Sequence, residues 1–92
     1  MRLKKQEIEI IKNTILAIFD DAKIYLFGSR LDDSKKGGDI DLFVISSCDN
    51  LFEKKIQALA KLKQKLHKPV DLVIHKDFQR DIEKEAMKGI IL

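Results

Sequence analysis

Cysteine is almost absent from this sequence, and long apolar runs are missing altogether. The single cysteine, Cys48, excludes an intrachain disulfide, and without a CxxC pair or a Cys/His cluster nothing indicates a zinc site. The basic residues 1–6 are followed by an amphipathic pattern instead of an apolar run, so we expect neither a signal peptide nor a membrane span. A lone cysteine fits a reducing cytoplasm best.

The net charge is small, and aromatic side chains are scarce. Eighteen Lys and Arg residues against fifteen Asp and Glu residues leave a net charge of +3, which is too little for a tail that coats nucleic acid. Aromatic residues make up 7% of the chain and fall within expected core stripes, so independent nucleic-acid binding is the weakest functional class. With 92 residues, we expect one domain, residues 1–92, with a single core.

The apolar pattern predicts three helices and three strands. Helical spacing marks residues 4–19, and β-branched runs mark strands at 23–28, 39–46 and 70–75. Asn50 and Glu53 resemble a capping box at the start of a second helix that stops before Pro69, and Asp77 is placed to cap a last helix. The expected stripe of the second helix is Phe52, Ile56, Leu59, Leu62 and Leu66, and that of the last helix is Phe78, Ile82, Ala86 and Ile90.

The order α-β-β-α-β-α predicts an α+β fold. The unit of strand, helix and strand over residues 39–75 is a right-handed crossover with parallel strands, whereas the short loop before residue 39 allows antiparallel pairing of the first two strands. We therefore expect a small mixed sheet of about three strands backed by helices.

Two aspartates stand at the start of an otherwise apolar strand. Asp39 and Asp41 are two residues apart, so on a strand they share a face, with Cα atoms roughly 6.6 Å apart. If the strands at 39–46 and 70–75 are parallel neighbours, Asp71 lies level with this pair. Two carboxylates 4 Å apart repel by about 4 kcal/mol at an effective dielectric near 20, so something must offset the repulsion.

Divalent cations would offset it, because oxygen ligands at this spacing suit Mg²⁺ or Mn²⁺, and Mg²⁺ typically takes one or two carboxylates plus substrate phosphates. Two alternatives remain open. The acids could simply occupy strand ends and turns, where Asp is common, or they could be neutralised by Lys35, Lys36 and Lys68.

Gly28 and Ser29 follow the first strand. A glycine there lets the backbone approach a ligand closely, and Ser29 can donate its hydroxyl, so the pair predicts a phosphate cradle; a simple turn is the alternative. The sequence contains no calcium-binding loop, Walker loop or dinucleotide-binding motif, because residues that each of these motifs requires are missing. We expect His67 and His75, which lie at element ends, to be solvated.

The spacing of these motifs resembles a known signature. Gly28-Ser29, nine intervening residues, Asp39-Ile40-Asp41 and the later Asp71 resemble the nucleotidyltransferase superfamily that includes DNA polymerase beta, and in particular its minimal nucleotidyltransferases. The resemblance implies the polymerase beta-like fold and two Mg²⁺ ions, with Mn²⁺ as a substitute, held by Asp39, Asp41 and Asp71. It also implies that Gly28, Ser29 and Arg30 hold the phosphates of ATP; for Arg30, a purely surface role is the alternative.

Minimal nucleotidyltransferases are typically paired with a separate helical HEPN protein, in modules that resemble type VII toxin–antitoxin systems. The resemblance therefore implies a protein adenylyltransferase, an antitoxin that transfers AMP from ATP to a hydroxyl, expected to be a tyrosine, of the HEPN toxin. The alternative is a non-catalytic nucleotide-binding subunit that neutralises a HEPN ribonuclease by forming a stoichiometric complex. Either function predicts a hetero-oligomer.

Overall fold

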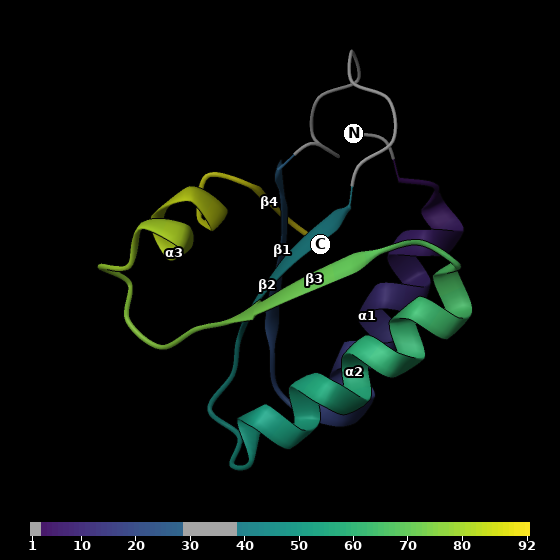
Figure 1. Cartoon of the computed structure of the whole chain (residues 1–92), viewed down its shortest axis with the longest axis horizontal. Helices are drawn as coiled ribbons and strands as arrows, with labels where there is room; N and C mark the ends of the chain where they lie inside the picture. Colours follow the sequence, from purple (N-terminus) through teal and green to yellow (C-terminus); the bar gives the residue numbers. More distant parts are fainter. Residues whose placement is uncertain (1–2, 29–38) are drawn as a thin grey trace.

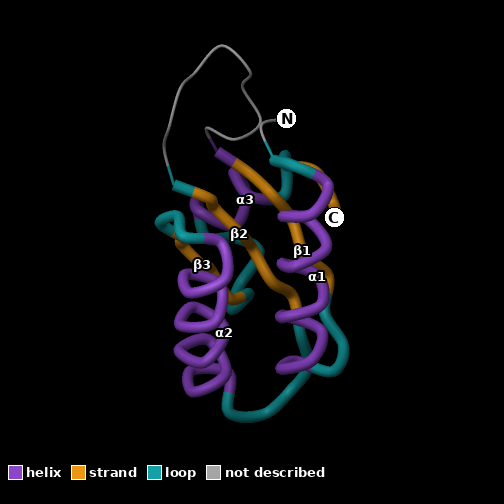
Figure 2. Tube along the Cα trace, turned by 90° about the vertical axis from the view of Figure 1, so that its right-hand side faces the viewer, coloured by secondary structure: helices purple, strands orange, loops and turns teal. Residues whose placement is uncertain are grey.

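A four-stranded mixed sheet carries α1 and α2 on one face and α3 on the other (Figures 1 and 2). The computed structural model describes residues 3–28 and 39–92. Its elements are α1 (Lys5–Phe19), β1 (Lys23–Phe27), β2 (Ile40–Ile45), α2 (Leu51–Leu66), β3 (Val70–Ile74), α3 (Asp81–Ala86) and β4 (Ile90–Ile91). No helix in these ranges has both the length and the apolar composition needed to cross a membrane.

The strands are ordered β3-β2-β1-β4 across the sheet. β2 pairs antiparallel with β1 and parallel with β3, as the loop lengths predicted. The predicted mixed α+β fold is therefore confirmed, and β4 is an addition to it.

Alternation along the strands separates two apolar clusters. Ile40, Leu42 and Val44 point toward α1 and α2, where they join the main core with Ile11 and Ile15 of α1. The intervening residues of β2 point to the opposite face, where Phe43 packs with Tyr25, Phe27 and Ala86. The acids of β2 and β3 belong to this second face, because they occupy the same alternate positions.

The predicted stripe of the second helix is buried only in its second half. Leu62 and Leu66 are buried as predicted and Leu59 packs partly against the core, whereas Phe52 is 70% and Ile56 is 53% exposed and Ala58 is buried instead. Phe52 and Ile56 precede Ala58 by six and two residues, which turns them about 120° and 160° away from it at 3.6 residues per turn. The capping-box prediction is also wrong, because Asn50 adopts a left-handed conformation (φ 56°) and its side chain makes no cap hydrogen bond.

The last predicted helix is much shorter than expected. The Asp77 carboxylate accepts a hydrogen bond from the Gln79 amide at 2.9 Å, which closes a turn, and α3 begins only at Asp81. Ile90 lies in β4, which pairs antiparallel with β1. The chain leaves the helix because β1 offers a free edge there, and the Leu92 amide donates to the Ile24 carbonyl at 2.8 Å.

Candidate functional site

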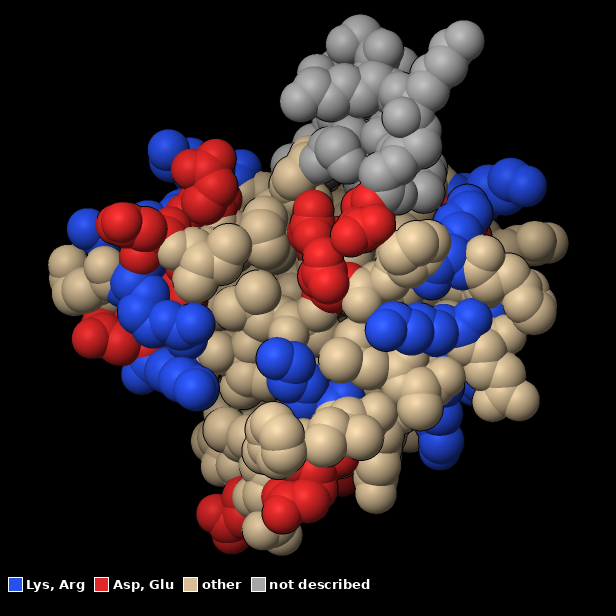
Figure 3. Space-filling model, viewed as in Figure 1, with Lys and Arg blue, Asp and Glu red and all other residues tan. Residues whose placement is uncertain are grey.

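The paired register of β2 and β3 brings two of the predicted acids side by side. Asp41 is the Cα partner of Asp71 in the parallel ladder, and it faces Phe27 across the antiparallel ladder with β1. Asp39 immediately precedes β2 and lies two residues before Asp41. Acidic side chains gather near the centre of the face in Figure 3, with Lys and Arg side chains around them.

Asp41 is half-buried, whereas Asp39 and Asp71 are exposed. Burial raises the pKa of the Asp41 carboxyl, and the charges of Asp71 and Asp39 and a hydrogen bond with Asp71 raise it further. The repulsion expected from the sequence therefore falls mainly on Asp41.

Gly28 lies directly against this carboxylate. A Cβ at Gly28 would stand 2.3 Å from Oδ2 of Asp41, and the residue has a φ of +79°, a conformation that other residues rarely adopt. Only glycine lets the end of β1 approach Asp41 so closely. Ser29 and Arg30, the other two residues of the predicted phosphate cradle, lie outside the described residues.

A cavity of about 450 Å³ opens beside Asp41 and Asp71. Phe27 of β1 and Ile82 of α3 line it from the second face, and Lys55 and Leu59 of α2 line it from around the edge of β3. No sequence motif distinguishes Lys55 from the other Lys and Arg residues, of which the chain has eighteen in all. Its place beside the acids follows from the packing of α2 against β3.

The acids fit a hard divalent cation in chemistry, since all their donors are carboxylate oxygens. Within residues 3–28 and 39–92, no three His, Cys, Asp or Glu side chains form a group that could hold a metal ion by themselves. This arrangement suits Mg²⁺, which is usually bound by one or two carboxylates together with substrate phosphates. Asp41 and Asp71 are the adjacent pair that meets this requirement.

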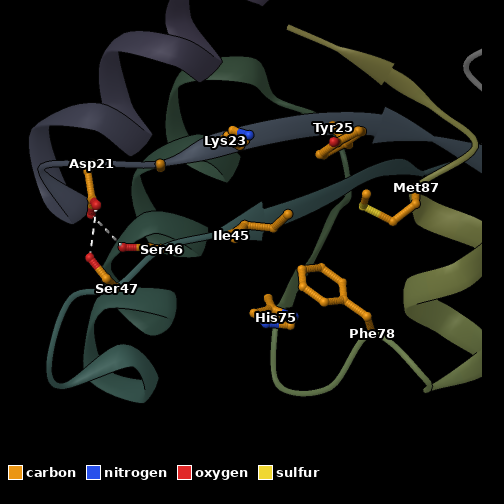
Figure 4. Close-up of a pocket in the computed structure, with 10 residues that line it drawn as sticks. Asp21, Lys23, Tyr25, Ile45, Ser46, Ser47, His75, Phe78 and Met87 are labelled. Carbon is orange, nitrogen blue, oxygen red and sulfur yellow. Dashed lines mark hydrogen bonds between the residues drawn. The ribbon is translucent and has the colours of Figure 1, made fainter.

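A larger cavity of about 650 Å³ lies at the opposite end of the second face (Figure 4). Lys23 and Ile45, which line it, are paired four residues along β1 from the pair formed by Phe27 and Asp41. Asp21 closes one side, where it accepts hydrogen bonds from Ser46 at 3.3 Å and Ser47 at 2.9 Å. None of the residues predicted for the site lines this cavity.

The prediction of a solvated histidine is wrong for His75. Its Nδ1 lies 2.6 Å from Oε1 of Glu83, and its ring stacks on Phe78 with centroids 3.9 Å apart. His67 is exposed at the end of α2, as expected.

Glu83 is fully buried and has four hydrogen-bond partners. The amides of Lys76 and Asp77 donate to it at 2.8 and 2.9 Å, and Arg80 Nη1 donates at 3.0 Å, in addition to the contact with His75. Although burial opposes ionisation, the Asp77 amide, His75 and the Lys76 amide together lower the pKa of Glu83 to about 2. Glu83 thereby fastens α3, which carries Ile82, to the end of β3.

Comparison with known protein families identifies this chain's domain. A family model that describes the nucleotidyltransferase domain matches residues 8–92. No curated protein matches the chain at the significance that we required.

Proposed function

The chain belongs to the nucleotidyltransferase domain family, and from this premise we propose that it transfers AMP from ATP to a hydroxyl of a partner protein. Its mixed α+β fold is consistent with the polymerase beta-like fold of nucleotidyltransferases. One observation carries the proposal: Asp41 and Asp71 are register partners, and Gly28 packs directly against Asp41.

Asp39, Asp41 and Asp71 are the proposed ligands for Mg²⁺, and Mn²⁺ is a chemically equivalent substitute. Nucleotidyltransferase domains generally use divalent metal ions, and a bound ion here would neutralise charge on the triphosphate and polarise the phosphorus under attack. Asp71 is exposed next to the cavity, where its carboxylate can accept the proton of the acceptor hydroxyl. The hydroxyl oxygen then bonds to the α-phosphorus of ATP, and pyrophosphate leaves with the electrons of the broken bond.

Gly28, Ser29 and Arg30 are the proposed phosphate-binding residues. Because Gly28 has no side chain, no Cβ occupies the space where the nucleotide would meet Asp41. For Ser29 and Arg30, the proposal rests on the sequence motif alone, with charge-assisted bonding by Arg30.

The proposed acceptor is a tyrosine of a HEPN protein, to which this chain acts as the antitoxin of a type VII-like module. Met87 and Ile91 are 41% and 59% exposed, and such apolar residues would suit a partner surface.

The direct test is labelling of the HEPN partner with α-labelled ATP and Mg²⁺. The Asp39→Asn/Asp41→Asn double variant should abolish labelling, whereas Asp49→Asn, an exposed acid outside the site, should leave it intact. Equal labelling by the double variant would reject the mechanism.

The second candidate is a non-catalytic subunit that neutralises a HEPN ribonuclease by complex formation. Met87 and Ile91 favour it, because these exposed apolar residues could contact a partner without any reaction at Asp41. Under this hypothesis, the double variant should still neutralise the ribonuclease at a stoichiometric ratio. Loss of neutralisation in that variant would select the transferase.

A further inference from the structure

The outer edge of β3 is free along the part of the chain that the structure describes, because β3 is the last strand on its side of the sheet. The Pro69 carbonyl accepts from Ile40, and the His75 amide donates to Val44, so the odd-numbered residues of β3 face β2. The backbone groups of Val70, Leu72 and Ile74 therefore point outward. Arg80 reaches only the Ile74 carbonyl, at 3.5 Å.

Two cavities follow this edge. One of about 450 Å³ lies beside Asp41 and Asp71, and another of about 290 Å³ lies farther along β3, where Lys76 and Arg80 line it. Both cavities include Lys55 and Val73 in their linings, so they form one groove along β3. We call this the β3 groove; in Figure 1, β3 runs between α2 and α3.

The β3 groove combines apolar side chains with positive charge. Phe52, which is 70% exposed, lines it from α2, and the half-exposed Ile82 lines it from α3. Among the described residues that line it, the charged ones away from the acids are Lys55, Lys76 and Arg80. Arg80 already contacts Glu83, which leaves the two lysines to attract a partner.

We propose that the β3 groove binds an extended, acidic segment of the acceptor protein as an added strand, and that this segment brings the acceptor hydroxyl to Asp71. The inference rests on the proposed transfer reaction and names the surface through which its substrate docks. Added strands take their affinity from main-chain hydrogen bonds and their specificity from pockets for alternate side chains. Here the outward backbone groups of Val70 and Leu72 can form the main-chain hydrogen bonds, and the two cavities can serve as the side-chain pockets.

A strand added at the edge of β3 would bring the acceptor residue of the bound segment close to Asp71. Side chains directly opposite on neighbouring strands have Cβ atoms about 4.5–5.5 Å apart. A residue of the added strand that points to the second face next to Asp71 therefore lies at the mouth of the 450 Å³ cavity. Acidic residues farther along the segment then lie near Lys55 and Lys76.

Binding can be measured without catalysis, using fluorescently labelled, acetylated peptides that carry a tyrosine between two valines. We expect the version with glutamates at its outer positions to bind about fivefold more tightly than the version with lysines. Lys55→Glu/Lys76→Glu should reverse this preference. Lys61→Glu, an exposed lysine of α2 that lines neither cavity, should leave it unchanged.

Backbone pairing is tested by N-methylation of alternate peptide residues. Methylation of the set whose amides face β3 should abolish binding, whereas methylation of the other set should not, and the Leu72 amide should exchange more slowly in the complex. The proposal would be overturned if both methylated sets had equal effects or if the lysine peptide bound as tightly as the glutamate peptide. It would also be overturned if single-stranded RNA or a second copy of this chain displaced the peptide.

Failure of the transfer reaction would be recognised separately. Asp41→Asn should abolish labelling of the HEPN partner while peptide binding persists, and peptide binding without any transfer by the wild type would reject the reaction but keep the docking surface. Conversely, undiminished labelling by Lys55→Glu/Lys76→Glu would reject the docking surface alone.

Discussion

Gly28 and Asp41 touch across the β1–β2 ladder, with the aspartate Oδ2 2.3 Å from the position that a Cβ at residue 28 would take. Gly28→Ala should therefore displace the carboxylate and strain a backbone whose φ is +79°. We expect transfer per folded molecule to fall by at least about tenfold, since small misplacements at a reacting centre are costly.

Gly89→Ala provides a comparison with a different expected outcome. Its Cβ would lie 2.2 Å from the Leu26 carbonyl oxygen, a backbone atom that cannot move aside as a side chain can. Thermal unfolding should show a larger loss of stability than for Gly28→Ala, and a smaller loss of transfer per folded molecule. If both variants lose activity only in proportion to folded protein, Gly28 has no special role in the site.

Asp41→Asn should stabilise the metal-free protein at neutral pH. Burial and the charges of Asp71 and Asp39 raise the folded-state pKa of Asp41, so its contribution to stability is fully present below the unfolded-state pKa and is lost as pH rises through the folded-state pKa. Removing the charge should raise the free energy of unfolding by about 0.5–2 kcal/mol at pH 7.

We expect Mg²⁺ to raise the melting temperature of the wild type, and the same variant should lose this increase. Asp49→Asn serves as the control for both measurements. A lower melting temperature for metal-free Asp41→Asn would show that the carboxylate is not under repulsion.

Glu83→Gln should destabilise the fold by about 3 kcal/mol, because it leaves His75 and Arg80 without their buried partner. The pKa of Glu83 is about 2 in the folded state, compared with 4.5 for a glutamate without these contacts. The stabilisation that Glu83 contributes is therefore complete above about pH 4.5 and is lost as pH falls toward 2. Acid titration of the unfolding free energy should show this loss in the wild type and a much smaller loss in the variant.

Glu85→Gln is the matched control, since Glu85 makes only an exposed contact with Lys88 at 3.5 Å. Its effect should stay within about 0.5 kcal/mol. Equal effects of the two substitutions would contradict the anchoring role of Glu83.

Asn50→Thr tests the start of α2. Threonine is also a good capping residue, but it tolerates the left-handed conformation at Asn50 poorly, so we expect a loss of about 1 kcal/mol in the free energy of unfolding. Asn50→Gly should be neutral or stabilising by chemical denaturation. A neutral Asn50→Thr would favour the capping box instead.

The sheet and the meeting of the acids were predictable because strand patterns are local and connection lengths limit pairing. An acid near the start of each of two parallel strands was sufficient to anticipate that Asp41 and Asp71 would lie level. The rest of the site depends on long-range packing. Glu83 has the sequence context of a solvated helical glutamate, and only the turn after β3 turns it inward.

The second helix shows a different limit. Its sequence contains two apolar stripes, and periodicity alone cannot decide which one faces the sheet. In the folded chain Ala58, Leu62 and Leu66 are buried, whereas Phe52 is exposed beside Lys55. The two isoleucines of β4 are too few to reveal a strand before its partner is known.

The pleat of β3 places Asp71 and Leu72 on opposite sides of one strand, one beside Asp41 and the other in the core beneath α2. A shift of β3 by one residue relative to β2 would bury the carboxylate in the core and expose the leucine to solvent. The placement of the acids and the integrity of the core therefore depend on the same strand register.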